Sequence, residues 1–150
     1  MKKIASFEVD HNKLQKGMYI SRIDGDIITY DIRMYVPNGG VYMSNAAAHS
    51  FEHLFATMAR NSRFEKNIVY VGPMGCRTGF YLVVRDMQHK DALALMQEIL
   101  HNIALWQGAV PGVSKIECGN YRSHSLAGAK KMAADMEQVL SDWTEEKMYY

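Results

Sequence analysis

Apolar and polar residues alternate along residues 28–36, and this pattern constrains the fold more than any other stretch of the chain. One side of the pattern is apolar: Ile28, Tyr30, Ile32, Met34 and Val36. The other side carries Thr29, Asp31, Arg33 and Tyr35. A period of two is typical of a β-strand with one face on a hydrophobic core. Asp24-Gly25-Asp26 lies between this run and an earlier one and favours a hairpin turn, whereas the Pro-Asn-Gly-Gly sequence at 37–40 ends the strand.

The remaining elements follow in an order that predicts the fold class. Two further strands, over 67–73 and 79–86, are rich in β-branched and aromatic residues and flank a turn that holds Cys76. Three helices are predicted, at 46–60, 91–106 and 125–143, with Ser44 or Asn45 as the cap of the first. A strand or extended segment over 112–121 carries Cys118. Paired strands with helices between the pairs predict an α+β fold, a mostly antiparallel sheet with helices packed on one face. Its other face is expected to be polar and exposed, or buried by a partner subunit.

Length and composition narrow the class of protein. The 150 residues predict one domain spanning 1–150, with a hydrophobic content of 48% that suffices for a core. The net charge of +1, without any Lys/Arg run, argues against binding to nucleic acid or to an anionic membrane. No stretch resembles a signal peptide or a membrane span, so we expect a cytoplasmic protein. Cysteines in that compartment are more often reactive or metal-bound than disulfide-bonded, although each can also be a small buried hydrophobe.

The helix predicted over residues 46–60 has two opposed faces. At about 100° per residue, His49, Glu52 and His53 share one side of the helix. The opposite side is apolar: Phe51, Leu54, Phe55 and Met58. A solvated polar face is the simpler interpretation of the first side. However, a solvent-exposed helix face usually carries lysines and glutamates, whereas here small residues flank the histidines: Ala46, Ala56 and Ala59.

Two histidines at positions i and i+4 point the same way, so both imidazoles can reach one metal ion. Glu52 projects beside them, in the position of a general base. The pattern HxxEH is the inverse of the zincin motif HExxH and offers the same geometry. A third ligand is needed, and either Cys76 or Cys118 can supply it; the spacing does not say which. Two histidines and one cysteine leave a fourth position open, which is typical of a catalytic site.

Several motifs along the chain resemble those of the LuxS family, S-ribosylhomocysteine lyase. They are SFEVDH, YDIR, HSFEH, GPMGCRTGFY and ECGNYRSHSLAGAK, in the family's order from Ser6 to about Lys130. The resemblance implies that His49, His53 and Cys118 bind the metal, with water or a substrate oxygen as the fourth ligand. It also implies that Glu52 is the general base and Cys76, as a thiolate, the second acid/base.

The resemblance further implies a homodimer, formed through the sheet side, with two active sites at the interface. Ser6 and His11 would then reach substrate bound mainly by the other subunit, and Arg33 would lie near Cys76 and contact the sugar. One divalent metal ion per subunit is implied, Fe(II), for which Zn or Co can substitute. His124 is expected only to cap or pack the last helix.

The implied reaction cleaves S-ribosylhomocysteine to homocysteine and dihydroxypentanedione, the precursor of the quorum-sensing signal autoinducer-2, without a redox cofactor. Two proton shifts bring the sugar carbonyl next to the carbon–sulfur bond, and β-elimination then expels the thiol. One departure concerns Tyr70, which stands where family members carry an acidic residue six positions before the cysteine of PMGC. Two alternatives stay open on the residues alone: a metallopeptidase that uses HxxEH and a metal-binding dimer without catalysis.

Overall fold

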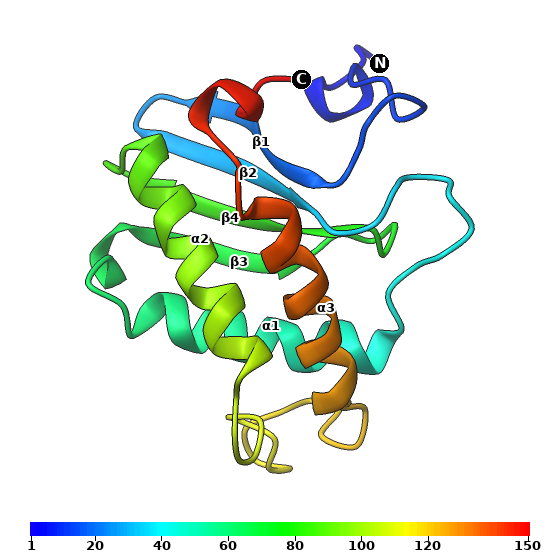
Figure 1. Ribbon diagram of the computed structural model, residues 1–150, viewed down its shortest axis with the longest axis vertical. Helices are drawn as coiled ribbons and strands as arrows, with labels where there is room; N and C mark the ends of the chain where they lie inside the picture. Colours follow the sequence, from blue (N-terminus) through cyan, green and yellow to red (C-terminus); the bar gives the residue numbers. More distant parts are fainter.

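Four strands form one antiparallel sheet with the order β1-β2-β4-β3 in the computed structural model, which describes residues 1–150 (Figure 1). The strands are β1 (Gly17–Asp24), β2 (Ile27–Arg33), β3 (Ile68–Pro73) and β4 (Gly79–Arg85). The predicted hairpin turn between β1 and β2 is confirmed. Its central residue Gly25 has φ +63°, a left-handed conformation that glycine adopts without steric cost.

Three helices pack on one face of this sheet, so the predicted α+β fold is confirmed (Figure 1). They are α1 (Asn45–Arg60), α2 (His89–Ala104) and α3 (Leu126–Leu140). Short 3₁₀ turns lie at Ala5–Phe7, Glu65–Asn67 and Glu145–Met148. The two chain termini lie side by side, next to the β1 edge of the sheet. None of the helices combines the length and the apolar character that crossing a membrane requires.

The core forms between the sheet and the apolar side of α1. On the strands, alternate side chains are completely buried, among them Tyr30 and Ile32 of β2 and Leu82 of β4. On the helix, Phe51, Leu54 and Phe55 are likewise inaccessible to solvent. Because this stripe packs on the sheet, the rotation of α1 about its axis is fixed, and the side that carries its histidines faces away from the core.

Three expectations are corrected by the structure. Strand β2 ends at Arg33 and not at Val36, because Met34 and Tyr35 both donate their N–H groups to the Thr78 carbonyl and leave the ladder. The polar side of β2 is not exposed at this end, since Asp31 is 2% and Arg33 is 3% accessible. Residues 112–121 form consecutive turns in place of an extended segment, with the N–H groups of 117 and 118 both bonded to the Ser114 carbonyl.

The core packing generates a stability prediction. Phe51→Ala removes a fully buried ring and should lower the free energy of unfolding by about 3–5 kcal/mol. Thr57→Ala, on the exposed side of the same helix, is the matched control and should change it by less than about 0.5 kcal/mol. Urea denaturation of both variants at equal metal content measures the difference. A Phe51→Ala variant as stable as the control would mean that α1 does not pack as described.

Candidate metal centre

Two histidines of α1 and two residues of the segment between α2 and α3 form a cluster. The ligating atoms of His49, His53, Cys118 and His124 all lie within 4.8 Å of one another. Cys118 Sγ is 3.4 Å from His49 Nε2. Donor atoms around a tetrahedral zinc ion are roughly 3.4–3.6 Å apart, so the cluster fits a single metal ion. The sequence analysis named three of these residues, His49, His53 and Cys118, as metal ligands. Its expectation that His124 only caps or packs the last helix is wrong, because the ring lies in the cluster.

The local structure of α1 explains why its two imidazoles converge. Ser44 caps the helix by accepting a hydrogen bond from the Ala47 N–H at 3.2 Å, which confirms one of the two predicted caps. The rings of His49 and His53 then lie one turn apart, with centroids 4.7 Å apart and planes at 84°. Both side chains are partly buried, and each Nε2 faces the cluster because its Nδ1 is engaged elsewhere.

Backbone carbonyls fix the proton positions of both rings. His49 Nδ1 lies 2.8 Å from the Ser123 carbonyl oxygen, and His53 Nδ1 lies 2.8 Å from that of Pro111. A carbonyl oxygen can only accept, so each Nδ1 carries the hydrogen and each Nε2 keeps a free lone pair. This is the arrangement found around most histidines that bind metals. Gly112 permits the second contact, because a Cβ atom there would lie 3.3 Å from His53 Nδ1 and its φ is +70°.

His124 lies against the same rings. Its imidazole stacks on that of His49, with centroids 4.0 Å apart and planes inclined by 25°. Desolvation, followed by repulsion from His49 and His53, lowers the pKa of His124 below its ordinary value. Sequence reasoning missed it because His124 is far from α1 along the chain, and only the spacing of Cys118 and His124 within one turn-rich segment was available as a signal.

Glu52 lies beside the cluster without belonging to it. Together with His49 it lines a cleft of about 300 Å³. The opposite wall comes from the turn between β3 and β4, through Pro73, Met74, Gly75 and Arg77. Glu52 is partly exposed and lines the cleft, so its carboxylate is available to a molecule bound there. The geometry suits a proton acceptor next to a metal ion.

Cys76 sits in that same turn, exposed to solvent and backed by a buried cation. Its Sγ is 3.0 Å from Thr78 Oγ1 and 3.8 Å from Arg33 Nη1. Arg33 also donates to Thr78 Oγ1 at 2.6 Å, so the threonine hydroxyl has its own hydrogen left for the sulfur. Burial alone would lower the pKa of Arg33, but the paired Asp31 carboxylate raises it, and the side chain stays charged.

Ser6, His11 and Arg33, the predicted substrate-binding residues, lie around one small hollow on the far side of β2. The hollow is also lined by Asp31, Tyr81 and Tyr150, and the Tyr150 hydroxyl donates to Asp31 Oδ2 at 2.8 Å. No residue lines both this hollow and the cleft of Glu52. Within one chain, therefore, Ser6 and His11 are brought to Arg33 and not to the metal cluster.

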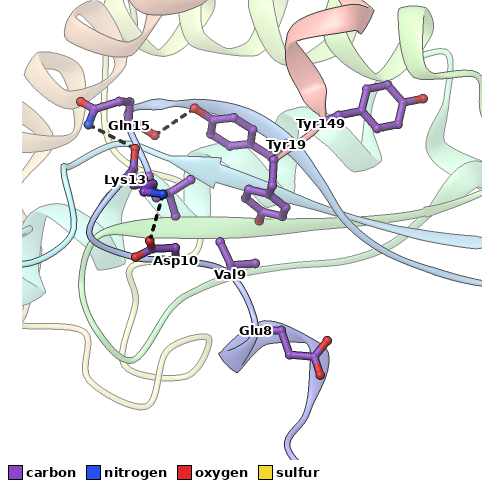
Figure 2. Close-up of a pocket in the computed structure, with 9 residues that line it drawn as sticks. Glu8, Val9, Asp10, Lys13, Gln15, Tyr19 and Tyr149 are labelled. Atoms are coloured by element: carbon purple, nitrogen blue, oxygen red, sulfur yellow. Dashed lines mark hydrogen bonds and ion pairs between the residues drawn. The ribbon is translucent and has the colours of Figure 1, made fainter.

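A larger hollow, of about 370 Å³, lies between the residues that follow Phe7 and the tyrosines at the chain's end (Figure 2) and shares Val9 and Tyr150 with the hollow of Ser6 and His11. Glu8, Val9, Asp10, Lys13, Gln15, Tyr19 and Tyr149 surround it. None of the residues that line it belongs to the metal cluster. The volume of a hollow therefore does not by itself identify the candidate active site.

Comparison with known proteins agrees with this constellation. The profile of a family described as S-Ribosylhomocysteinase (LuxS) matches residues 4–147. The S-ribosylhomocysteine lyase of Desulfotalea psychrophila is 43% identical over 157 residues, which cover all of this chain and 99% of that protein. The lyases of Borreliella burgdorferi and Clostridium acetobutylicum are 44% and 42% identical over 156 residues, with the same coverage. The chain belongs to the LuxS family. The relatives carry the name of a carbon–sulfur lyase, and this LuxS chain has a His/Cys cluster that fits one metal ion.

Removal of the cluster's thiol gives a direct prediction on metal content. Cys118→Ala should lose the metal, because two imidazoles alone bind a divalent ion weakly at an open site. Cys76→Ala is the matched control and should keep a full complement. Elemental analysis of both LuxS variants, purified without air, measures the difference. Normal metal content in Cys118→Ala would require a different ligand set.

Proposed function

We propose that this protein is a metal-dependent lyase that cleaves the thioether of S-ribosylhomocysteine to homocysteine and dihydroxypentanedione, the autoinducer-2 precursor used in quorum sensing. The observation that carries the proposal is the meeting of two oriented imidazoles and a thiol beside Glu52, in a chain of the LuxS family. The whole chain, 1–150, would act as a single catalytic domain. Its free thiols suit the cytoplasm, where cysteines stay reduced.

His49 Nε2, His53 Nε2 and Cys118 Sγ would hold one divalent metal ion per subunit. A donor set of two nitrogens and one sulfur is borderline-soft and suits Fe(II), Zn or Co. We propose Fe(II) as the ion used in the cell. A metal ion bound here supplies Lewis acidity to a sugar carbonyl and so favours removal of the proton on the neighbouring carbon. A sulfur as third ligand also favours the lyase over a metallopeptidase, which would use a carboxylate there.

Glu52 would move protons on one side of the sugar. Its carboxylate lies in the cleft next to His49, so it can accept a proton from a sugar carbon and return it to the adjacent oxygen or carbon. Each such transfer moves the carbonyl one position along the chain without net oxidation. Once the carbonyl lies two carbons away from the carbon that bears sulfur, removal of the proton on the carbon between them would form a C=C bond and break the C–S bond. Homocysteine would leave as a thiolate and take up a proton.

Cys76 would be the second acid/base. The Arg33 guanidinium lies 3.8 Å and the Thr78 hydroxyl 3.0 Å from its sulfur, and both hold the side chain in place. Gly75 and Arg77, the neighbours of Cys76, line the cleft of Glu52, so a sugar in this cleft would lie close to both groups. Arg33, Ser6 and His11 would contact the substrate's polar groups.

A homodimer would complete the site. The hollow of Ser6, His11 and Arg33 is separate from the metal cleft within one chain, and a partner packed on the sheet side could join the two kinds of surface. The exposed apolar side chains of Ile4 and Phe7, which flank Ser6 near the chain's N-terminus, would be covered in such a dimer. Sedimentation that gives the mass of a single chain under assay conditions would contradict this part of the proposal.

Two substitutions test whether Cys76 and Glu52 transfer protons without binding the metal. Cys76→Ala and Glu52→Gln should each keep the metal yet lower the rate of thiol release from S-ribosylhomocysteine by about 10²–10⁴-fold, the usual contribution of a positioned acid or base. A thiol-reactive dye follows the release, and elemental analysis gives the metal content. Full activity of Cys76→Ala would remove it from proton transfer, and loss of metal in Glu52→Gln would make Glu52 a ligand.

A further inference from the structure

A partly buried relay of hydrogen bonds runs from the start of α3 to the cluster's thiol through Ser50 and His124. We propose that His124 is a positioning residue that donates a hydrogen bond from Nε2 to the Cys118 thiolate, and that it is not the fourth metal ligand. The inference rests on the ligand set proposed above, namely His49, His53 and Cys118.

Distances alone do not separate the two roles of His124. Its Nε2 is 3.7 Å from Cys118 Sγ, against 3.4 Å for His49 Nε2. Both values are close to the separation of two donor atoms around one tetrahedral ion, roughly 3.6 Å for nitrogen and sulfur. The value of 3.7 Å is equally compatible with an N–H···S hydrogen bond, which is long because sulfur is large. The positions of the protons and the directions of the ring planes have to decide.

The hydroxyl group of Ser50 indicates which ring nitrogen of His124 carries the proton. Its hydroxyl oxygen accepts from the backbone N–H of Ser125 at 2.8 Å, an N–H that is shared with the Ala46 carbonyl at 3.2 Å. Ser50 is completely buried, and the one acceptor within reach of its own hydrogen is His124 Nδ1, at 3.1 Å. A buried hydroxyl left without an acceptor is costly, so Nδ1 accepts. A neutral imidazole with an accepting Nδ1 carries its proton on Nε2, the nitrogen that faces the sulfur.

This tautomer is the opposite of that in the two histidines of α1. His49 and His53 donate from Nδ1 to backbone carbonyls and present bare Nε2 atoms. His124 accepts at Nδ1 and presents an N–H. A nitrogen that carries a proton has no lone pair in the ring plane for a metal ion, so three of the four clustered side chains are suited to bind and the fourth to donate.

The ring planes disfavour His49 and His124 as joint ligands of one ion, and the tautomers then select His49. The lone pair of an imidazole nitrogen lies in the plane of the ring, so a ligated ion lies near that plane. The rings of His49 and His124 are stacked at 4.0 Å with only 25° between their planes, and an ion in the plane of one is displaced from the plane of the other. The ring of His53 stands at 84° to that of His49 and at 74° to that of His124, so it can share an ion with either ring but not with both.

Two consequences follow for the proposed chemistry. A hydrogen bond to the thiolate withdraws charge from sulfur and holds the Cys118 side chain in one orientation, as outer hydrogen bonds do for many metal ligands. An N–H at this place also leaves the protein with three ligands and not four, so that one position stays open for a substrate oxygen. Four protein ligands would be typical of a closed, structural site.

Long-range ¹H–¹⁵N NMR of the zinc-loaded full chain tests the inference directly, because it assigns the tautomer of each histidine ring. We expect His124 with its proton on Nε2, and His49 and His53 with protons on Nδ1 and zinc-shifted Nε2 signals. An unprotonated Nε2 in His124 would overturn the inference while leaving the proposed function in place. Absence of zinc shifts at His49 and His53 would instead overturn the proposed metal site itself.

Variants add a second readout that does not depend on activity. Ser50→Ala removes the hydroxyl that fixes the tautomer and should move at least part of the His124 signal to the Nδ1–H form, whereas Thr57→Ala on the same helix should not. His124→Phe keeps a flat ring but removes the donor, and should weaken zinc binding about 10-fold in competition with a chelator. His124→Gln places an amide N–H near the same point and should restore most of this loss. Equal zinc affinity in His124→Phe and the unmodified protein would contradict the N–H···S bond.

Discussion

Two hydrogen bonds between α1 and the segment that leads from α2 to α3 determine what the cluster can do. His49 donates to the Ser123 carbonyl and His53 to the Pro111 carbonyl, and both bonds turn Nε2 toward Cys118. Without them the imidazoles could rotate or exchange tautomers, and the chance that two lone pairs point at one place would fall. The segment that brings Cys118 to the helix is therefore also the segment that orients the two histidines. Cys118 and the two carbonyl groups that orient the histidines therefore belong to the same loop, which packs beside α1.

The hydrophobic core makes this arrangement possible because it fixes the rotation of α1 about its axis. Phe51, Leu54 and Phe55 are fully buried against the sheet, so the opposite side of the helix cannot turn inward. The same sheet positions the second half of the site. Arg33 at the end of β2 and Thr78 beside β4 hold the sulfur of Cys76, and its neighbours Gly75 and Arg77 line the cleft of Glu52. A helix and a hairpin, each fixed by core packing, thus face each other with different chemical groups.

The sequence predicted those features that depend on local periodicity. The alternation along β2 and the two faces of α1 gave the fold class and placed His49, Glu52 and His53 on one side of the helix. Features that depend on tertiary packing were missed or left open. The choice between Cys76 and Cys118 as the partner of the histidines requires the path of the chain in space, since both are distant from α1. His124 was set aside because nothing near it in sequence indicates that its ring would stack on His49. The burial of Asp31 and Arg33 depends on Tyr150, at the opposite end of the chain.

Diffraction from crystals of the cobalt-loaded protein, recorded at the cobalt absorption edge, tests the central claim most directly. We expect one anomalous peak per chain, about 2.1 Å from His49 Nε2 and His53 Nε2 and about 2.3 Å from Cys118 Sγ. We also expect that the next nearest group is not a protein nitrogen. A peak elsewhere, or one that lacks any of these three atoms in its coordination sphere, would contradict the account.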